Sequence, residues 1–156
     1  MAELVHATAM EGLSLIGANQ DLAAVELEMV DDDNRAIHLR DALSPLLSEF
    51  DYIVIDCPPS LSVLTINALT AAHLVVVPLQ CEYYALEGLS KLAGTVERVR
   101  ASLNPMLRLH GVVLTMYDGR NNLAREVAAE VRRHFRVYRT VIPRNCLLYT
   151  SPSPRD

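Results

Sequence analysis

The sequence predicts an α/β fold in which helices cover both faces of an open, mostly parallel sheet. Short apolar runs of strand length alternate along the chain with segments that have the spacing of amphipathic helices. The strand-like runs are continuously apolar, which is typical of parallel strands that are buried on both faces. With 51% hydrophobic residues among 156, the chain has ample material for one packed core.

The expected helices follow from apolar spacing and from local breakers. Segment 21–29 has helical spacing with Asp21 as its N-cap, and an acidic loop at 31–34 follows it. A helix over 37–50 contains Pro45, which is expected to break or kink it. The remaining expected helices are 61–72, 86–102 and 123–135.

The expected strands are short apolar runs between these helices. Run 52–55 is mainly β-branched and is bounded by acidic residues. Because the strands are separated by helices of adequate length, each is expected to lie parallel to its neighbours. The other expected strands are 12–16, 74–78, 109–116 and 138–142.

The net charge of −5 conceals two halves of opposite sign. Residues 1–97 contain three basic and 15 acidic side chains, whereas residues 98–144 contain ten arginines and three acids. This asymmetry fits either an anionic partner for the second half or salt bridges between the halves.

Composition also bears on the compartment. The three cysteines, Cys57, Cys81 and Cys146, have no pattern of a disulfide framework or a metal site. No apolar stretch approaches the roughly 20 residues that cross a bilayer, and the first ten residues do not resemble a secretory signal. We therefore expect a cytoplasmic protein without membrane association.

The clearest local motif is YIVIDCPPS at 52–60, in which Asp56 ends an apolar run and two prolines follow. In open α/β sheets, ligands bind beyond the carboxyl ends of the strands, so this carboxylate is expected to face a nucleotide crevice. Magnesium beside phosphates keeps several waters, and an Asp in this place can hold one of them. The alternative is an Asp that merely ends a strand in a turn.

Four consecutive blocks resemble the ParA/Soj family of partition ATPases. They are DYIVIDCPPSLSVLTINALTAA, VVVPLQCEYYALEGLSKL, GVVLTMYDGRNNLAREVAAEVRRHF and VYRTVIPRN. The resemblance extends over residues 11–145 and is nearly gapless; the family usually has about two more residues between Phe135 and Val137. It implies a P-loop NTPase-like fold of the deviant Walker type, truncated at both ends.

The family resemblance also implies a nucleotide site. ATP with Mg²⁺ would be sandwiched between two protomers of a homodimer, and Asp56 would be the catalytic residue that contacts the metal through a water. Pro143 and Asn145 match the family's base-binding signature, since a proline packs on adenine and an amide offers both donor and acceptor. Met116 could line the same pocket, or could equally be a core methionine.

The chain departs from the family in two respects. It has no glycine- and lysine-rich phosphate loop, and its one lysine, Lys91, has no such neighbours. We therefore expect a partial ATPase domain over 1–145 that is inactive by itself, with truncation and degeneration both open. Residues 146–156, with alternating Ser and Pro, are expected to be a non-native or disordered tail.

The resemblance further implies a partner. Arg120 matches an arginine that contributes to sequence-independent DNA binding in the family, and nearby arginines support that interpretation. A second family arginine is Leu147 here. The expected protein is nucleoid-associated, binds non-specific DNA as an ATP-dependent dimer, and is stimulated by a ParB-like centromere-binding protein.

Two alternatives remain open. One is a MinD-like positioning ATPase that binds a membrane, and the other is a non-enzymatic pseudo-ATPase that acts as an interaction module. Tyr83 and Tyr84 likewise allow two interpretations, amphipathic packing or a place near the protomer interface.

Overall fold

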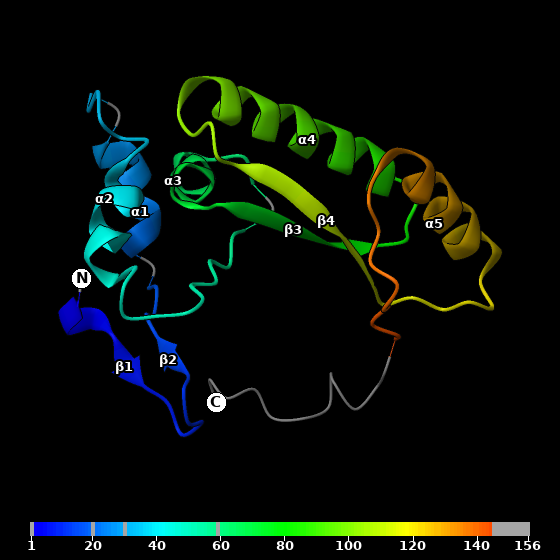
Figure 1. Ribbon diagram of the computed structural model, residues 1–156. Helices are drawn as coiled ribbons and strands as arrows, with labels where there is room; N and C mark the ends of the chain where they lie inside the picture. Colours follow the sequence, from blue (N-terminus) through cyan, green and yellow to red (C-terminus); the bar gives the residue numbers. More distant parts are fainter. Residues whose placement is uncertain (1, 20, 30, 59, 145–156) are drawn as a thin grey trace. The chain divides into compact units, whose positions relative to one another are not determined.

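The computed structural model describes residues 2–19, 21–29, 31–58 and 60–144 of the chain. Two compact units are present, Met1–His73 with Val99–Leu107, and Leu74–Arg98 with Arg108–Asp156. Each unit buries its own set of apolar side chains. Figure 1 shows their helices and strands in chain order.

The first unit opens with a short hairpin. A 3-10 turn at Ala2–Leu4 precedes β1 (His6–Ala7), which pairs antiparallel with β2 (Ser14–Leu15). Gly12 lies in the connecting turn with a φ of 76°, a left-handed conformation that glycine adopts without strain. The expected strand at 12–16 is therefore reduced to two residues. It lies in an antiparallel hairpin instead of the parallel sheet.

The helices of the first unit follow the predicted pattern. They are α1 (Asp21–Glu28), α2 (His38–Leu43) and α3 (Val63–Ala71). After α2 the chain continues as a 3-10 turn, Ser44–Leu46, which confirms the predicted break at Pro45. A proline has no N–H to donate and its ring crowds the preceding turn, so it starts a new short element there.

The prediction of a strand at 52–55 is wrong. The segment from Tyr52 to Pro58 is not part of any sheet, and the side chains of Tyr52 and Val54 are 88% and 92% exposed. β-branched residues favour an extended backbone, but a strand also needs a neighbour for its N–H and C=O groups. No described strand pairs with this segment.

The second unit has the predicted βαβα order. Its elements are β3 (Leu74–Gln80), α4 (Ala85–Ser102, of which residues 99–102 are grouped with the first unit), β4 (Arg108–Thr115) and α5 (Asn122–His134). β3 and β4 run parallel, with a register shift between Val75 and Val76. The α/β class with a parallel sheet is thus confirmed, and the strands and helices expected here agree within a few residues.

The expected strand at 138–142 lies along β4 without becoming a regular strand. Two isolated parallel bridges join Val112 to Val137 and Tyr117 to Pro143. Between them, the Ile142 N–H donates to the Leu114 carbonyl at 2.8 Å. This segment therefore extends the sheet on the side of β4 away from β3.

The core of the second unit lies between the sheet and its helices. Val77, Leu79, Val112 and Leu114 of the strands pack with Leu89 and with the apolar face of α5. On the opposite side of β3, Leu74 and Val76 are about half exposed. The α5 side chains that face the core are Ala124, Val127, Ala128 and Val131.

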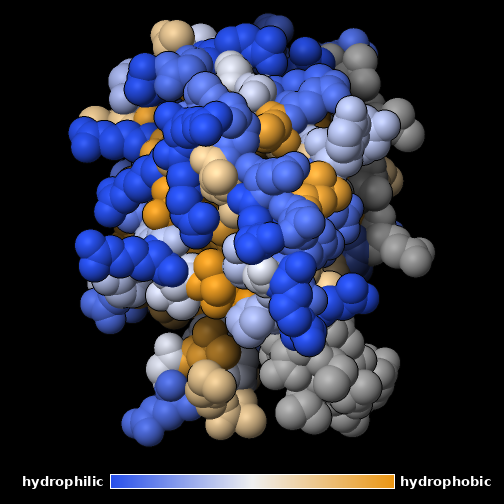
Figure 2. All heavy atoms as spheres, turned by 90° about the vertical axis from the view of Figure 1, so that its right-hand side faces the viewer, coloured by the Kyte–Doolittle hydropathy of each residue, from blue (hydrophilic) through white to orange (hydrophobic). Residues whose placement is uncertain are grey.

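The outer surface beside α5 has the opposite character. The side of the molecule where α5 lies in Figure 1 faces the viewer in Figure 2, and hydrophilic side chains cover most of it. Within the described residues, no helix has both the length and the apolar character that crossing a membrane requires.

Candidate functional site

Asp56 lies in the first unit, on the unpaired segment that follows Tyr52. Its side chain is exposed, and its negative charge contributes to a raised pKa of the neighbouring Cys57 thiol, for which burial is the larger cause. The Cys57 Sγ also lies 3.8 Å from the Ile55 carbonyl oxygen. The carboxylate is therefore accessible, although no regular strand end fixes it as the sequence had suggested.

A single exposed carboxylate is better suited to Mg²⁺ than to a metal ion that takes all its ligands from the protein. Mg²⁺ usually takes one or two carboxylates, several waters and substrate phosphates. In the described part of the chain, His, Cys, Asp and Glu side chains form no group of three that could hold a metal by themselves. Asp56 thus fits a water-mediated Mg²⁺ contact. The described residues offer no lysine-rich cradle for the phosphates that would complete such a site.

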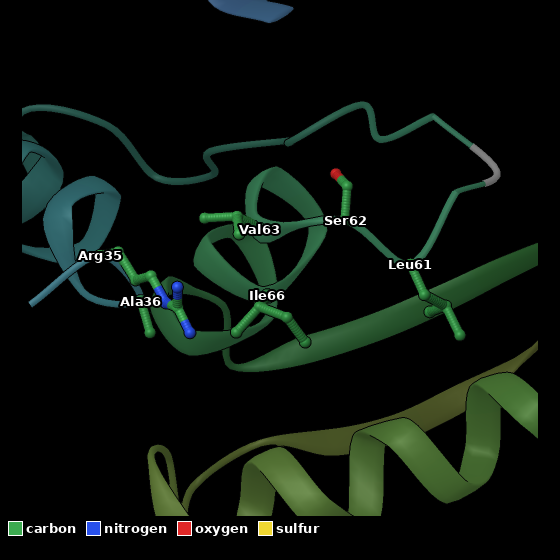
Figure 3. A pocket seen from close by; sticks show the side chains of 6 residues that line it. All are labelled: Arg35, Ala36, Leu61, Ser62, Val63 and Ile66. Atoms are coloured by element: carbon green, nitrogen blue, oxygen red, sulfur yellow. The ribbon is translucent and has the colours of Figure 1, made fainter. Parts of the chain in front are cut away.

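A cavity of about 330 Å³ opens just after the Asp56 segment, at the start of α3 (Figure 3). Ser62 is the N-cap of α3, yet its hydroxyl makes no capping bond, and its buried Oγ has no described hydrogen-bond partner. Thr65 is anchored instead, since its hydroxyl donates to the Ser60 carbonyl at 2.6 Å. The cavity is lined by Arg35, Ala36, Leu61, Ser62, Val63 and Ile66.

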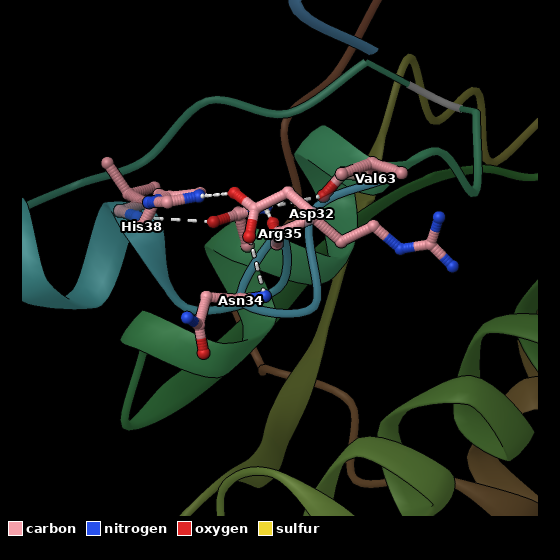
Figure 4. A network of polar contacts seen from close by, with 7 residues as sticks. Asp32, Asn34, Arg35, His38 and Val63 are labelled. Atoms are coloured by element: carbon pink, nitrogen blue, oxygen red, sulfur yellow. Dashed lines mark hydrogen bonds and ion pairs between the residues drawn. The ribbon is translucent and has the colours of Figure 1, made fainter. Parts of the chain in front are cut away.

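A polar network holds α3 against the loop before α2 (Figure 4). The Asn67 amide, only 5% exposed, donates to the Arg35 and Val63 carbonyls and accepts from the Leu39 N–H. Because every polar atom of this amide is used, the position of α3 is tied to that loop.

The acidic loop before α2 is ordered by its own contacts. The Asp32 carboxylate contacts the His38 ring and accepts the Asn34 N–H at 2.8 Å. The contact with His38, followed by the backbone bond from Asn34, lowers the pKa of Asp32 below its ordinary value of 3.8.

In the second unit, the candidate base-binding residues meet at the carboxyl end of β4. The bridge between Tyr117 and Pro143 places Pro143 beside the chain that leaves β4, one residue from Met116. The Tyr117 N–H donates to the Ile142 carbonyl at 3.2 Å, and the Arg144 N–H donates to the Tyr117 carbonyl at 3.4 Å. The structure therefore places Pro143 beside the end of β4, close in the backbone to Met116. A base-binding pocket that both residues share stays a prediction. Asn145 lies outside the described residues.

Met116 has an unusual backbone conformation. Its φ of 53° is the one positive value among the described residues other than glycine. Such a conformation costs a side chain with a Cβ of the order of 1 kcal/mol or more, and it clusters at functional sites. Met116 lies directly after β4, where the chain leaves the sheet for Tyr117 and the loop that carries Arg120.

Gly111 lets the segment that carries Pro143 approach β4. A Cβ at this position would lie 3.0 Å from the Tyr138 ring and 3.1 Å from the Arg136 carbonyl oxygen. The Val112 N–H donates to that same carbonyl at 2.8 Å, so the approach belongs to the sheet pairing. The sequence had not singled out this glycine.

Arg120 lies in the loop between β4 and α5, where sequence reasoning had placed a DNA contact. Its guanidinium is 93% exposed but pairs with Asp118, with an Nε–Oδ1 distance of 3.2 Å. The backbone N–H of Arg120, at 3.0 Å, and then its side chain hold the pKa of Asp118 below the ordinary 3.8. Sequence reasoning missed this pairing; the signal for it is the Asp-Gly-Arg segment, since an Asp carboxylate in a turn can accept the N–H two residues on.

Tyr83 and Tyr84 are not packed, contrary to one of their two interpretations. Their side chains are 76% and 75% exposed, and the rings meet edge to face at a centroid distance of 5.1 Å. The neighbouring Cys81 is buried, and burial raises the pKa of its thiol. The aromatic pair therefore stands on the surface between β3 and α4.

Comparison with known proteins agrees with this α/β arrangement. A family described as AAA domain matches residues 1–109. The chain is 52% identical over 153 residues to the chromosome partitioning protein ParA of Myxococcus xanthus, covering 97% of this chain and 54% of that protein. It is also 52% identical over 153 residues to the sporulation initiation inhibitor protein Soj of Bacillus subtilis, covering 97% of this chain and 60% of Soj.

A solved structure has a similar fold. Cobyrinic acid a,c-diamide synthase from Mycobacterium smegmatis, with bound ADP and magnesium, superposes with a TM-score of 0.85 at 41% identity, covering 93% of this chain and 60% of that one. The chain thus spans somewhat more than half the length of the relatives it matches. By sequence and by fold, it belongs to the AAA domain family and, within it, to the ParA/Soj-type partition ATPases.

Proposed function

We propose that this chain is part of an ATP-dependent partition protein that moves DNA during chromosome or plasmid segregation. The observation that carries the proposal is the bridge between Tyr117 and Pro143, which brings Pro143 to the carboxyl end of β4, where α/β proteins bind ligands. The relatives named for chromosome partitioning supply the biological role.

In this proposal Pro143 and Met116, with Asn145, hold the adenine, and the exposed Asp56 carboxylate orders a water on Mg²⁺. The metal neutralises phosphate charge when it is bound. The protein residues would contribute position: those at the carboxyl end of β4 would hold the base, and Asp56 would accept a hydrogen bond from a metal-bound water. Nucleotide binding then favours a homodimer that binds DNA, and a ParB-like protein stimulates hydrolysis and release.

A membrane-binding MinD-like role has weaker support. The apolar face of α5 is buried against the sheet, so this helix has no free apolar face to insert into a lipid surface. The pseudo-ATPase alternative is kept as an outcome of the test, since a chain with a single lysine cannot supply the usual phosphate cradle.

The test compares Asp56→Asn with Asp51→Asn in the complete gene product. Both residues are exposed on the same stretch of chain, so both variants should fold. Asp56→Asn should abolish Mg²⁺-dependent ATP turnover while ATP binding is retained, and Asp51→Asn should behave as the wild type. The 156-residue chain alone should show no turnover above background. Normal turnover in a folded Asp56→Asn protein would rule out the role given to Asp56, and an inactive complete product would favour the pseudo-ATPase.

A further inference from the structure

The arginines of α5 divide into two groups. At about 100° per residue, positions seven apart in a helix lie on the same flank, so Arg125 and Arg132 project together. Arg133 and Glu130 project from other directions and pair at 2.8 Å, while His134 contacts the same Glu130 at 3.0 Å. Positive charge is thus neutralised on one side of the helix and left on the other.

A third arginine lies just beyond the helix. Arg136 follows the end of α5 at His134 and is exposed, as are Arg125 and Arg132. In the described residues none of these three has an ion pair, and the Arg125 guanidinium donates only to the neutral Asn122 amide. We call Arg125, Arg132 and Arg136 the α5 arginine row.

Helix geometry gives the spacing of the two arginines within α5. The rise of about 1.5 Å per residue separates the Cα atoms of Arg125 and Arg132 by about 10 Å along the axis of α5. Two exposed guanidinium groups on one flank of the helix can therefore contact separate phosphates of one duplex, since arginine binds phosphate oxygens.

We propose that the α5 arginine row is a phosphate-contacting surface for duplex DNA and carries more of the binding than Arg120, an inference that rests on the proposed partition function. Arg120 already has a carboxylate partner in Asp118, whereas the row has none in the described residues. A phosphate that binds Arg120 must displace or approach Asp118, and a phosphate that binds the row meets no such competitor.

The partner is a polyanion with charge at regular intervals and not a bilayer. Membrane-surface helices combine basic residues with an apolar face that enters the lipid. In α5 the residues of that face, including Val127 and Val131, are buried in the core of the second unit. Only the polar side is available, and it suits a surface contact with phosphates.

The experiment uses the complete gene product with ATP and Mg²⁺, binding two duplexes of unrelated sequence at several salt concentrations. Its variants are the triple Arg125→Gln, Arg132→Gln and Arg136→Gln, the single Arg120→Gln, and the control Arg133→Gln. All these side chains are exposed, and circular dichroism verifies that each variant is folded. Vesicles of phosphatidylglycerol and phosphatidylcholine in equal parts test the membrane.

The triple variant should bind both duplexes more weakly by a similar factor. Its log–log salt slope should flatten by about 2.7, which is about 0.9 for each of three phosphate contacts. Arg120→Gln should flatten the slope by less, and Arg133→Gln should change little, since its charge is already paired. A triple variant that binds like the wild type while Arg120→Gln weakens binding overturns this inference alone. Wild-type protein that binds vesicles but no duplex overturns both this inference and the proposed function.

Discussion

Reversing the charge of Arg120 tests the one DNA contact that the sequence itself suggested. In the structure its guanidinium is bound by Asp118 through Nε and Nη2, at 3.2 and 3.4 Å, and its own N–H also bonds to that carboxylate at 3.0 Å. Arg120→Glu removes the cation and leaves two carboxylates side by side in a loop that faces solvent. The variant should therefore lose one phosphate contact and also repel the DNA backbone.

The magnitude follows from one contact. The salt slope on duplex DNA should flatten by about 0.9, and binding should weaken by a similar factor on unrelated sequences, because phosphate contacts carry no base readout. ATP binding should not change, since Arg120 lies beyond the residues that meet at the carboxyl end of β4. DNA binding is measured by fluorescence anisotropy at several salt concentrations, with ATP and Mg²⁺.

Asp118→Asn is the matched variant. It keeps Arg120 and removes the carboxylate that competes with phosphate, so DNA should bind more tightly than to the wild type. If Arg120→Glu left both affinity and slope unchanged, Arg120 would not contact DNA. If Asp118→Asn weakened binding as much as Arg120→Glu, then Asp118 would serve to hold the arginine in its binding position and would not compete with phosphate.

Two further predictions concern the frame that holds the site. Gly111→Ala should lower the free energy of unfolding by about 1–3 kcal/mol, because its Cβ would lie 3.0 Å from the Tyr138 ring and 3.1 Å from a backbone oxygen. The control is Gly94→Ala in α4, where no atom lies within 4 Å of the added Cβ. This change should raise the free energy of unfolding by up to about 1 kcal/mol. Urea denaturation measures both free energies of unfolding, and equal changes in the two variants would contradict the close approach at Gly111. Asn67→Leu should cost about 2–4 kcal/mol because three backbone groups lose the partner that this buried amide provides; an unchanged urea midpoint would show that α3 does not depend on that network.

The sequence predicted what local pattern can determine. The helices at 86–102 and 123–135 were found because their apolar spacing is encoded within each segment itself. The parallel pair β3 and β4 was found because a strand, a helix and a strand follow one another in the chain. The pocket assigned to Met116 and Pro143 came from the family resemblance and stays a prediction; the structure adds that Pro143 pairs with Tyr117, the residue after Met116.

The features that the sequence could not predict depend on contacts with residues outside the local segment. The residues around Val54 have strand composition, but composition does not supply the neighbouring strand, and the segment stays unpaired. Tyr83 and Tyr84 fit an amphipathic helix by spacing, yet they precede α4 and face solvent. The ion pair of Arg120 with Asp118 required a turn conformation that residue types alone allow but do not dictate.

The geometry also bears on the two explanations of the opposite charges of the chain's halves. If salt bridges were their purpose, the arginines after Arg108 would be expected to find acidic partners. Instead the pairs in and next to α5 are local, Arg120 with Asp118 and Arg133 with Glu130, and they use two of the three acids in this half. In the described residues the α5 arginine row remains without an acid, since Arg125 donates only to the neutral Asn122 amide and neither Arg132 nor Arg136 has an ion pair. Unpaired like charges repel one another and destabilise the folded state, so a row of them is better explained by an anion that binds there than by the stability of the fold.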